Sequence, residues 1–129
     1  HTRGHFVRAV LEGVAFSLRD TLTLFAELGV PVKAIRLGGG GARGPLWRQI
    51  QADVYGHAVE QLEAEEGGAF GAALLAGTGV GAWPSVEAAC AATVRVAQTI
   101  EPKHAPTMNA AYEEYRRIYP ALRAIAGPA

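Results

Sequence analysis

One glycine-rich segment, residues 35–46 with the sequence IRLGGGGARGPL, holds the residue types best suited to chemistry. Glycine has no Cβ, so a ligand can lie directly on the backbone of the four consecutive glycines at 38–41. Pro45 suits the first position of a following helix, and the N–H groups that begin a helix attract anions. A tight turn would need only one or two glycines. The segment therefore predicts a nucleotide or phosphate site made of Gly39, Gly40, Gly41, Ala42, Arg43 and Gly44.

The glycine segment also satisfies the dinucleotide pattern G-x-G-x-x-G, at Gly39, Gly41 and Gly44. Glu60 lies near the end of the next expected strand, where an acidic side chain would bind the ribose of NAD. Two features weaken this interpretation. A long helix comes before the first strand, and Pro45 directly follows the third glycine, where close helix–strand packing is expected. An NAD-binding module is therefore the second interpretation.

Other catalytic chemistries have little support in the sequence. No G-K-S/T follows the glycines, which excludes a P-loop, and the scattered histidines with a single cysteine lack the spacing of a zinc site. Ser17 and Ser85 lack the sharp turn that exposes a serine nucleophile. Glu63, Glu65 and Glu66 fit a solvated loop before a helix better than a carboxylate site for a metal or for acid–base work.

Two large side chains accompany the glycines. Arg43 lies on the loop itself, where it would contact a phosphate or a base, or else face solvent, and the sequence leaves both open. Trp47 could stack on a base, but its helical spacing to Ile50 is more typical of a core position.

Length and composition limit the function classes. A chain of 129 residues with 50% hydrophobic and 19% charged residues forms at most one globular domain. Twelve basic residues balance twelve acidic ones, which gives no electrostatic reason to expect a nucleic acid or a membrane surface as a partner. Cys90 has no second cysteine to pair with, which suits a cytoplasmic protein. Because the chain starts at His1, almost inside a strong helical pattern, we expect it to be part of a longer protein.

The elements that position the glycine segment follow from the apolar spacing. A long amphipathic helix is expected over residues 5–28, and its apolar stripe comprises Phe6, Val7, Val10, Leu11, Val14, Leu18, Leu22, Phe25 and Leu28. A strand at 32–37 enters the glycines, a helix at 45–55 leaves them, and a second strand follows at 57–62.

The second half of the chain predicts three more helices and one extended segment. An alanine-rich helix ends near residue 76 before Gly77-Thr78-Gly79, and a short helix at 86–92 has Ser85 as its N-cap. Residues 94–100 are extended, and a last helix at 107–124 is kinked or ended by Pro120. The order of elements indicates an α/β fold with a parallel pair and few strands, whose missing strands we expect upstream of His1.

Four motifs, in order, resemble the FGGY family of carbohydrate kinases. Residues 2–20 (TRGHFVRAVLEGVAFSLRD) look like the start of the late half of that family's second domain, and residues 39–54 (GGGARGPLWRQIQADV) are similar to its nucleotide loop and the following helix. Residues 66–77 (EGGAFGAALLAG) resemble the helix that packs beside the loop. Residues 112–122 (YEEYRRIYPAL) look like the C-terminal helix of the xylulokinase branch.

The resemblance implies a two-domain kinase of the actin-like, ribonuclease-H-like type, with sugar and ATP bound in the cleft between the domains. Residues 1–129 would be a partial C-terminal nucleotide-binding domain that lacks its upstream half. The parent enzyme would transfer the γ-phosphoryl group of Mg-ATP to a ketose such as D-xylulose. Gly40 and Gly41 would approach the nucleotide through the backbone. Gly44 stands where family members usually carry a serine or asparagine that touches the adenine.

In that family the sugar site and the catalytic aspartate belong to the first domain, so the resemblance assigns no catalytic residue to this chain. Asp20 and Asp53 lie in expected helices without a matching motif and are predicted to be structural. The chain alone is expected to be inactive. Apolar helix faces and sheet edges without partners also raise the alternative of a non-catalytic, self-associating α/β module, with the long first helix as its contact face.

Overall fold

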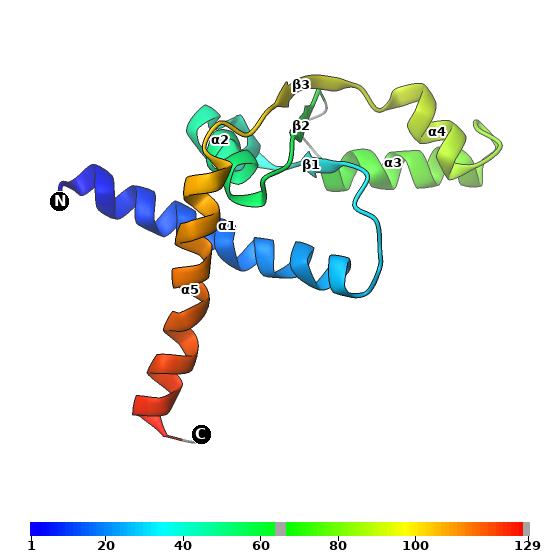
Figure 1. Ribbon diagram of the computed structural model, residues 1–129. Coiled ribbons are helices and arrows are strands. Elements are labelled where there is room, and N and C mark those ends of the chain that lie inside the picture. The colour runs from blue at the N-terminus through cyan, green and yellow to red at the C-terminus, as the bar shows by residue number, and fades with distance from the viewer. Residues whose placement is uncertain (64–66, 128–129) are drawn as a thin grey trace.

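The computed structural model describes residues 1–63 and 67–127, so Glu65 and Glu66 of the expected acidic loop lie outside the described residues. The described elements are α1 (Arg3–Glu27), β1 (Ile35–Leu37), the 3-10 helix η1 (Gly40–Arg43), α2 (Pro45–Tyr55), β2 (Val59–Leu62), α3 (Gly67–Gly79), α4 (Val86–Thr93), β3 (Val96–Ile100) and α5 (Ala105–Ala126). Figure 1 shows α1 and α5 crossing below α2, with α3 and α4 extending to one side of the strands.

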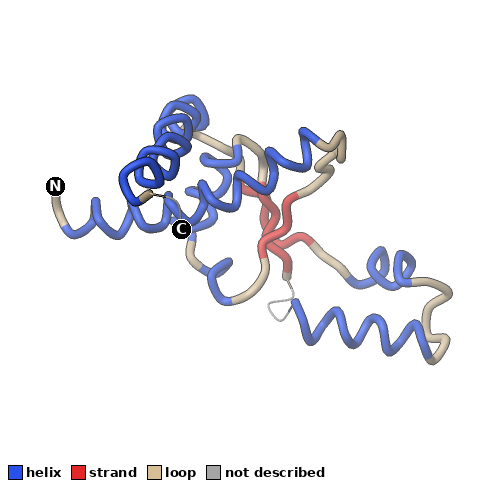
Figure 2. The backbone as a smooth tube through the Cα atoms, turned by 90° about the horizontal axis from the view of Figure 1, so that it is seen from below, coloured by secondary structure: helices blue, strands red, loops and turns tan. Residues whose placement is uncertain are grey.

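The three described strands form one small sheet in the order β1-β2-β3. β1 pairs with β2 in parallel, in the register Ile35↔Val59, and α2 is the crossover between them. This confirms the expected parallel pair. β3 pairs with β2 antiparallel, because α3 and α4 lead the chain away from the end of β2 and back to it. Glu63 N accordingly donates to Arg95 O at 3.0 Å beside that end, and Figure 2 shows the helical pair standing away from the strands.

The core forms around α2. Its side chains Ile50, Ala52 and Val54 are almost fully buried, and they belong to one cluster with Phe16 of α1 and Tyr112 of α5. Each large apolar side chain buried in this way contributes about 1.5–3 kcal/mol to folding. The cluster fixes α2 against α1 and α5 and so fixes the position of the segment that enters α2.

The apolar stripe expected on α1 is covered only in part, because Leu11 and Leu22 pack against the core while most of the stripe stays exposed. Phe6 is 73% exposed and Val10 is 67% exposed, whereas Ala15 and Phe16 are buried. Arg19, which the spacing places largely off the stripe, donates through Nη1 to Val54 O at 2.8 Å and lies over the ring of Tyr112. Apolar periodicity correctly predicts a helix here, but α1 has apolar residues on more than one face. The packing of α2 and α5 selects which face is covered.

Several expected boundaries differ from the structure for local reasons. β1 begins only at Ile35, because its partner strand begins only at Val59, after the left-handed turn at Gly56 (φ +66°). α3 continues through Gly77 to Gly79, and a Cβ at Gly77 would overlap the ring of Trp83. α5 spans Ala105–Ala126, two residues longer at each end than expected, and of the two effects expected of Pro120 it does not end the helix.

Other local predictions are confirmed. α2 spans Pro45–Tyr55 as its apolar spacing indicates, and Gly56 ends it. Ser85 caps α4, because its Oγ accepts a hydrogen bond from Ala88 N at 3.2 Å. Within the described part of the chain, no helix combines the length and the apolar character needed to cross a bilayer.

Candidate functional site

The glycine segment forms a 3-10 turn between β1 and α2, where the sequence predicts only a loop. Gly39 starts the turn with φ +74° and ψ 178°, a backbone conformation that is essentially restricted to glycine. Ala42 N donates to Gly39 O at 3.1 Å, and Gly44 N donates to Gly41 O at 3.2 Å. The four glycines therefore build a defined turn, with Pro45 starting α2 directly after it.

One side of this turn offers bare backbone. A Cβ placed on Gly38, Gly39 or Gly40 would have no other group within 4 Å, so these residues face open space. Gly40 and Gly41 are the first residues of the turn, and their N–H groups have no acceptor inside it. Both glycines are exposed, and N–H groups at the start of a helical turn suit an anionic group such as a phosphate.

The turn lies where ligands usually bind in a fold of this class. It follows the carboxyl end of β1 and lies beside the carboxyl end of the parallel strand β2. A small hollow there is lined by Leu37, Gly39, Ala42 and Gln61, among others. Ligands of open α/β sheets bind outside the carboxyl ends of the parallel strands. The sheet topology and the exposed glycine backbone therefore both indicate a ligand site at this turn.

Trp47 supports the other side of the turn. A Cβ on Gly41 would stand 3.4 Å from Trp47 Nε1, and one on Gly44 would stand 3.6 Å from Trp47 Cβ. The indole is half-buried and packs against the main cluster, which agrees with its helical spacing to Ile50. These are ordinary van der Waals distances, so Gly41 lies directly against the indole and Gly44 against the Cβ of Trp47.

Arg48 holds the end of the turn, and the sequence reasoning missed it. Its Nη1 donates to Ala42 O at 2.6 Å and to Arg43 O at 3.0 Å, while its Nη2 lies 3.4 Å from Gln98 Oε1 on β3. A cation in the first turn of a helix opposes the helix dipole. That unfavourable placement is the signal that could have singled it out. Arg43 itself is exposed on the turn.

The two helical aspartates serve the packing of α5. Asp53 is 1% exposed and accepts hydrogen bonds from Lys103 N (2.5 Å), His104 N (3.0 Å) and Gln49 Nε2 (3.1 Å). Burial raises the pKa of Asp53, but these hydrogen bonds outweigh it, so the pKa lies below its ordinary value.

Asp20 Oδ1 accepts a hydrogen bond from the hydroxyl group of Tyr112. Burial and this hydrogen bond raise the pKa of Tyr112. Both aspartates thus have structural partners, as predicted.

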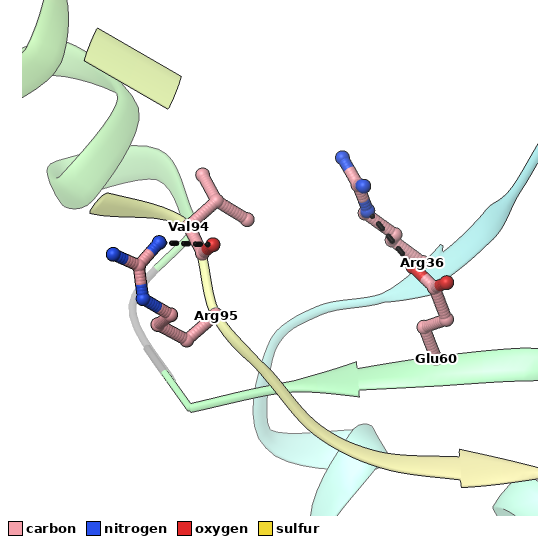
Figure 3. Close-up of polar contacts among 4 residues, drawn as sticks. All are labelled: Arg36, Glu60, Val94 and Arg95. Carbon is pink, nitrogen blue, oxygen red and sulfur yellow. Dashed lines mark hydrogen bonds and ion pairs between the residues drawn. The ribbon is translucent and has the colours of Figure 1, made fainter. Parts of the chain in front are cut away.

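Glu60 is not brought to the glycine turn. It is the second residue of β2, pairs in register with Arg36, and accepts a hydrogen bond from Arg36 Nε at 3.0 Å (Figure 3). A ribose-binding acid is expected at the end of this strand with its carboxylate available. Arg95, also drawn in Figure 3, donates to Val94 O and to carbonyls at the end of α4.

No group of three or more histidine, cysteine, aspartate or glutamate side chains that could hold a metal ion occurs among residues 1–63 and 67–127.

Residues 1–80 match the FGGY family of carbohydrate kinases, C-terminal domain. The chain belongs to this family. A xylulose kinase from Bacillus subtilis is 39% identical over 121 residues, which cover 92% of this chain and 24% of that protein. The chain thus spans about a quarter of the length of its curated relatives.

Solved structures agree with this assignment. The crystal structure of xylulose kinase from Rhodospirillum rubrum is 34% identical with a TM-score of 0.73, and the match covers 97% of this chain and 25% of that one. A Plasmodium falciparum glycerol kinase with ADP is 26% identical with a TM-score of 0.75, and the match covers 92% of this chain and 24% of that one. These neighbours confirm the α/β, actin-like fold class. They do not favour the NAD-binding alternative, which Glu60 also fails to support.

Proposed function

We propose that this chain supplies part of the nucleotide-binding side of an ATP-dependent sugar kinase. In this proposal Gly39, Gly40, Gly41, Ala42, Arg43 and Gly44 form the cofactor-binding residues. The observation that carries it is the 3-10 turn, which presents open backbone at the carboxyl ends of two parallel strands. The similar glycerol kinase from Plasmodium falciparum was solved with ADP, which supports an adenine nucleotide as the ligand.

The glycines contact the nucleotide through their main chain. N–H groups at Gly40 and Gly41 lie against the phosphate side of the adenosine, where a side chain would keep the ligand away. Gly44 offers no side chain to the adenine, and Pro45 offers no N–H. Recognition of the base therefore depends on backbone groups more than in relatives that carry serine or asparagine at this position.

The complete protein would transfer the γ-phosphoryl group of ATP to a ketose, with D-xylulose as the first candidate because the curated relatives include xylulose kinases. Glycerol is the second candidate acceptor, since glycerol kinases also match. Residues 1–129 act in this proposal as a partial C-terminal domain in the cytoplasm. Mg²⁺ would enter with the phosphates of ATP and would neutralise part of their charge.

A coupled assay of ADP release tests this function. The complete protein that carries this chain is incubated with Mg-ATP and, separately, D-xylulose, glycerol and D-ribulose. We expect ADP release with one of these acceptors and none from the isolated 129-residue chain, because the residues assigned to sugar binding and catalysis come from another domain. ADP release by the isolated chain at the rate of the complete protein would contradict the assignment of sugar binding and catalysis to another domain. Binding of NAD in preference to ADP would contradict the nucleotide assignment.

We also infer that the chain, when produced alone, self-associates through α1. The supporting observation is the row of exposed apolar side chains on this helix, which comprises Phe6, Val7, Val10, Val14, Leu18, Leu24, Phe25 and Leu28. Large exposed apolar patches of this kind mark contact surfaces.

A further inference from the structure

We propose that Arg48 is a positioning residue for the nucleotide: its guanidinium holds the carbonyls of Ala42 and Arg43 and so fixes the end of the 3-10 turn whose first residues are Gly40 and Gly41. This inference rests on the proposed nucleotide-binding function of the turn. Arg48 acts on the turn from behind, through two carbonyls, and needs no contact with the nucleotide itself.

The two carbonyls that Arg48 holds belong to consecutive peptide groups. Nη1 donates to Ala42 O at 2.6 Å and to Arg43 O at 3.0 Å. A trans peptide is planar, so holding a carbonyl also fixes the N–H of the next residue on the opposite side. The contacts therefore set the peptide planes that end in the N–H groups of Arg43 and Gly44, and Gly44 N closes the turn on Gly41 O.

The same guanidinium connects the turn to two rigid elements. Arg48 belongs to α2, whose next turn is in the buried core, and its Nη2 faces Gln98 Oε1 on β3 at 3.4 Å. Four successive glycines have more backbone freedom to lose than any other sequence. Arg48 holds the residues that follow them, and Gly44 N closes the turn on Gly41 O. A turn that is ordered at this end before the ligand arrives loses less entropy on binding.

Two features of the position of Arg48 are unfavourable for stability, and its hydrogen bonds to the turn offset them. Its positive charge lies in the first turn of α2, where the helix dipole disfavours a cation. Its Nε is buried and, within the described part of the chain, has no hydrogen-bond partner. A planar fork that reaches several oxygens at once is a property of arginine that lysine lacks.

The test is Arg48→Lys in the complete protein, with ADP affinity measured by titration calorimetry and KM measured for ATP and for the sugar. We expect ADP affinity to fall and the KM for ATP to rise about ten-fold, with the KM for the sugar and the melting temperature nearly unchanged. A merely structural role would lower the melting temperature and affect both substrates alike. Equal ADP affinity in Arg48→Lys and wild type would overturn the inference.

Arg95→Lys is the matched control. Arg95 also donates to backbone carbonyls, those of Ala91, Ala92 and Val94, but they lie at the end of α4. This variant should bind ADP like the wild type, and an equal loss of affinity would count against a specific role for Arg48.

The outcomes separate this inference from the proposed function. A wild-type protein that does not bind ADP refutes the proposed function, whereas normal ADP binding by Arg48→Lys refutes only the role of Arg48. If Arg48→Lys does not fold, Arg48→Gln takes its place in the same measurements. Loss of folding in both variants would assign Arg48 to the stability of the core and overturn the positioning role.

Discussion

At the scale of single residues, Gly39 is the position where the backbone itself demands glycine. Its φ of +74° with ψ of 178° is a strained conformation for any side chain, although the space around it is open. Gly39→Ala should therefore lower the free energy of unfolding by about 1–3 kcal/mol or distort the turn. Urea unfolding followed by circular dichroism measures this loss.

Gly40→Ala is the matched control for that substitution. Gly40 also faces open space, but its φ is not positive, so its stability should change by less than about 0.5 kcal/mol. The added methyl group would nevertheless stand on the face assigned to the nucleotide, and calorimetry should show weaker ADP binding. Unchanged ADP affinity in Gly40→Ala would contradict the placement of the ligand on this face.

At the scale of elements, Asp53 joins α2 to the start of α5, and its substitution tests that junction. Asp53→Ala removes a buried carboxylate that accepts partly buried hydrogen bonds from the N–H groups of Lys103 and His104. The free energy of unfolding at pH 7 should fall by about 1–3 kcal/mol. Glu114→Gln, in an exposed ion pair with Arg117, should change it little.

The hydrogen bonds of Asp53 at this junction also predict that the free energy of unfolding depends on pH. The pKa of Asp53 is lower in the folded protein than in the unfolded chain, where it is about 4. Its stabilising contribution is therefore complete above about pH 4 and is lost as the pH falls through the folded-state pKa. Urea unfolding between pH 3 and pH 7 should show that the free energies of unfolding of wild type and Asp53→Ala differ less at pH 3 than at pH 7. A difference that stays constant with pH would contradict this account.

The elements also show how far the sequence alone could lead. The bounds of α2 follow from Pro45, Gly56 and the apolar spacing between them, because all three signals are local. The face that α1 buries and the direction of β3 depend on partners distant in the sequence, so periodicity could not predict them. The glycine segment could be recognised from its composition, whereas the support from Arg48 could be found only once α2 and β3 were placed.

At the scale of the whole molecule, the exposed side of α1 predicts how the isolated chain behaves. Light scattering across a dilution series should show a mass above 13.5 kDa that falls with dilution. Val10→Glu should favour the monomer, because it places a charge in the middle of the exposed apolar row. Val80→Glu changes a still more exposed valine outside α1 and should have no effect. A monomer at every concentration would contradict self-association.

The central claim, that a nucleotide lies on the glycine turn, is tested most directly by hydrogen exchange of the complete protein with and without ADP. Mass spectrometry of peptic fragments would follow the N–H groups of residues 38–46 against those of α5, after calorimetry has shown that ADP binds. We expect ADP to slow exchange at 38–46 and to leave α5 unchanged, because the open N–H groups of Gly40 and Gly41 gain an acceptor. Bound ADP that leaves residues 38–46 unprotected would contradict the account.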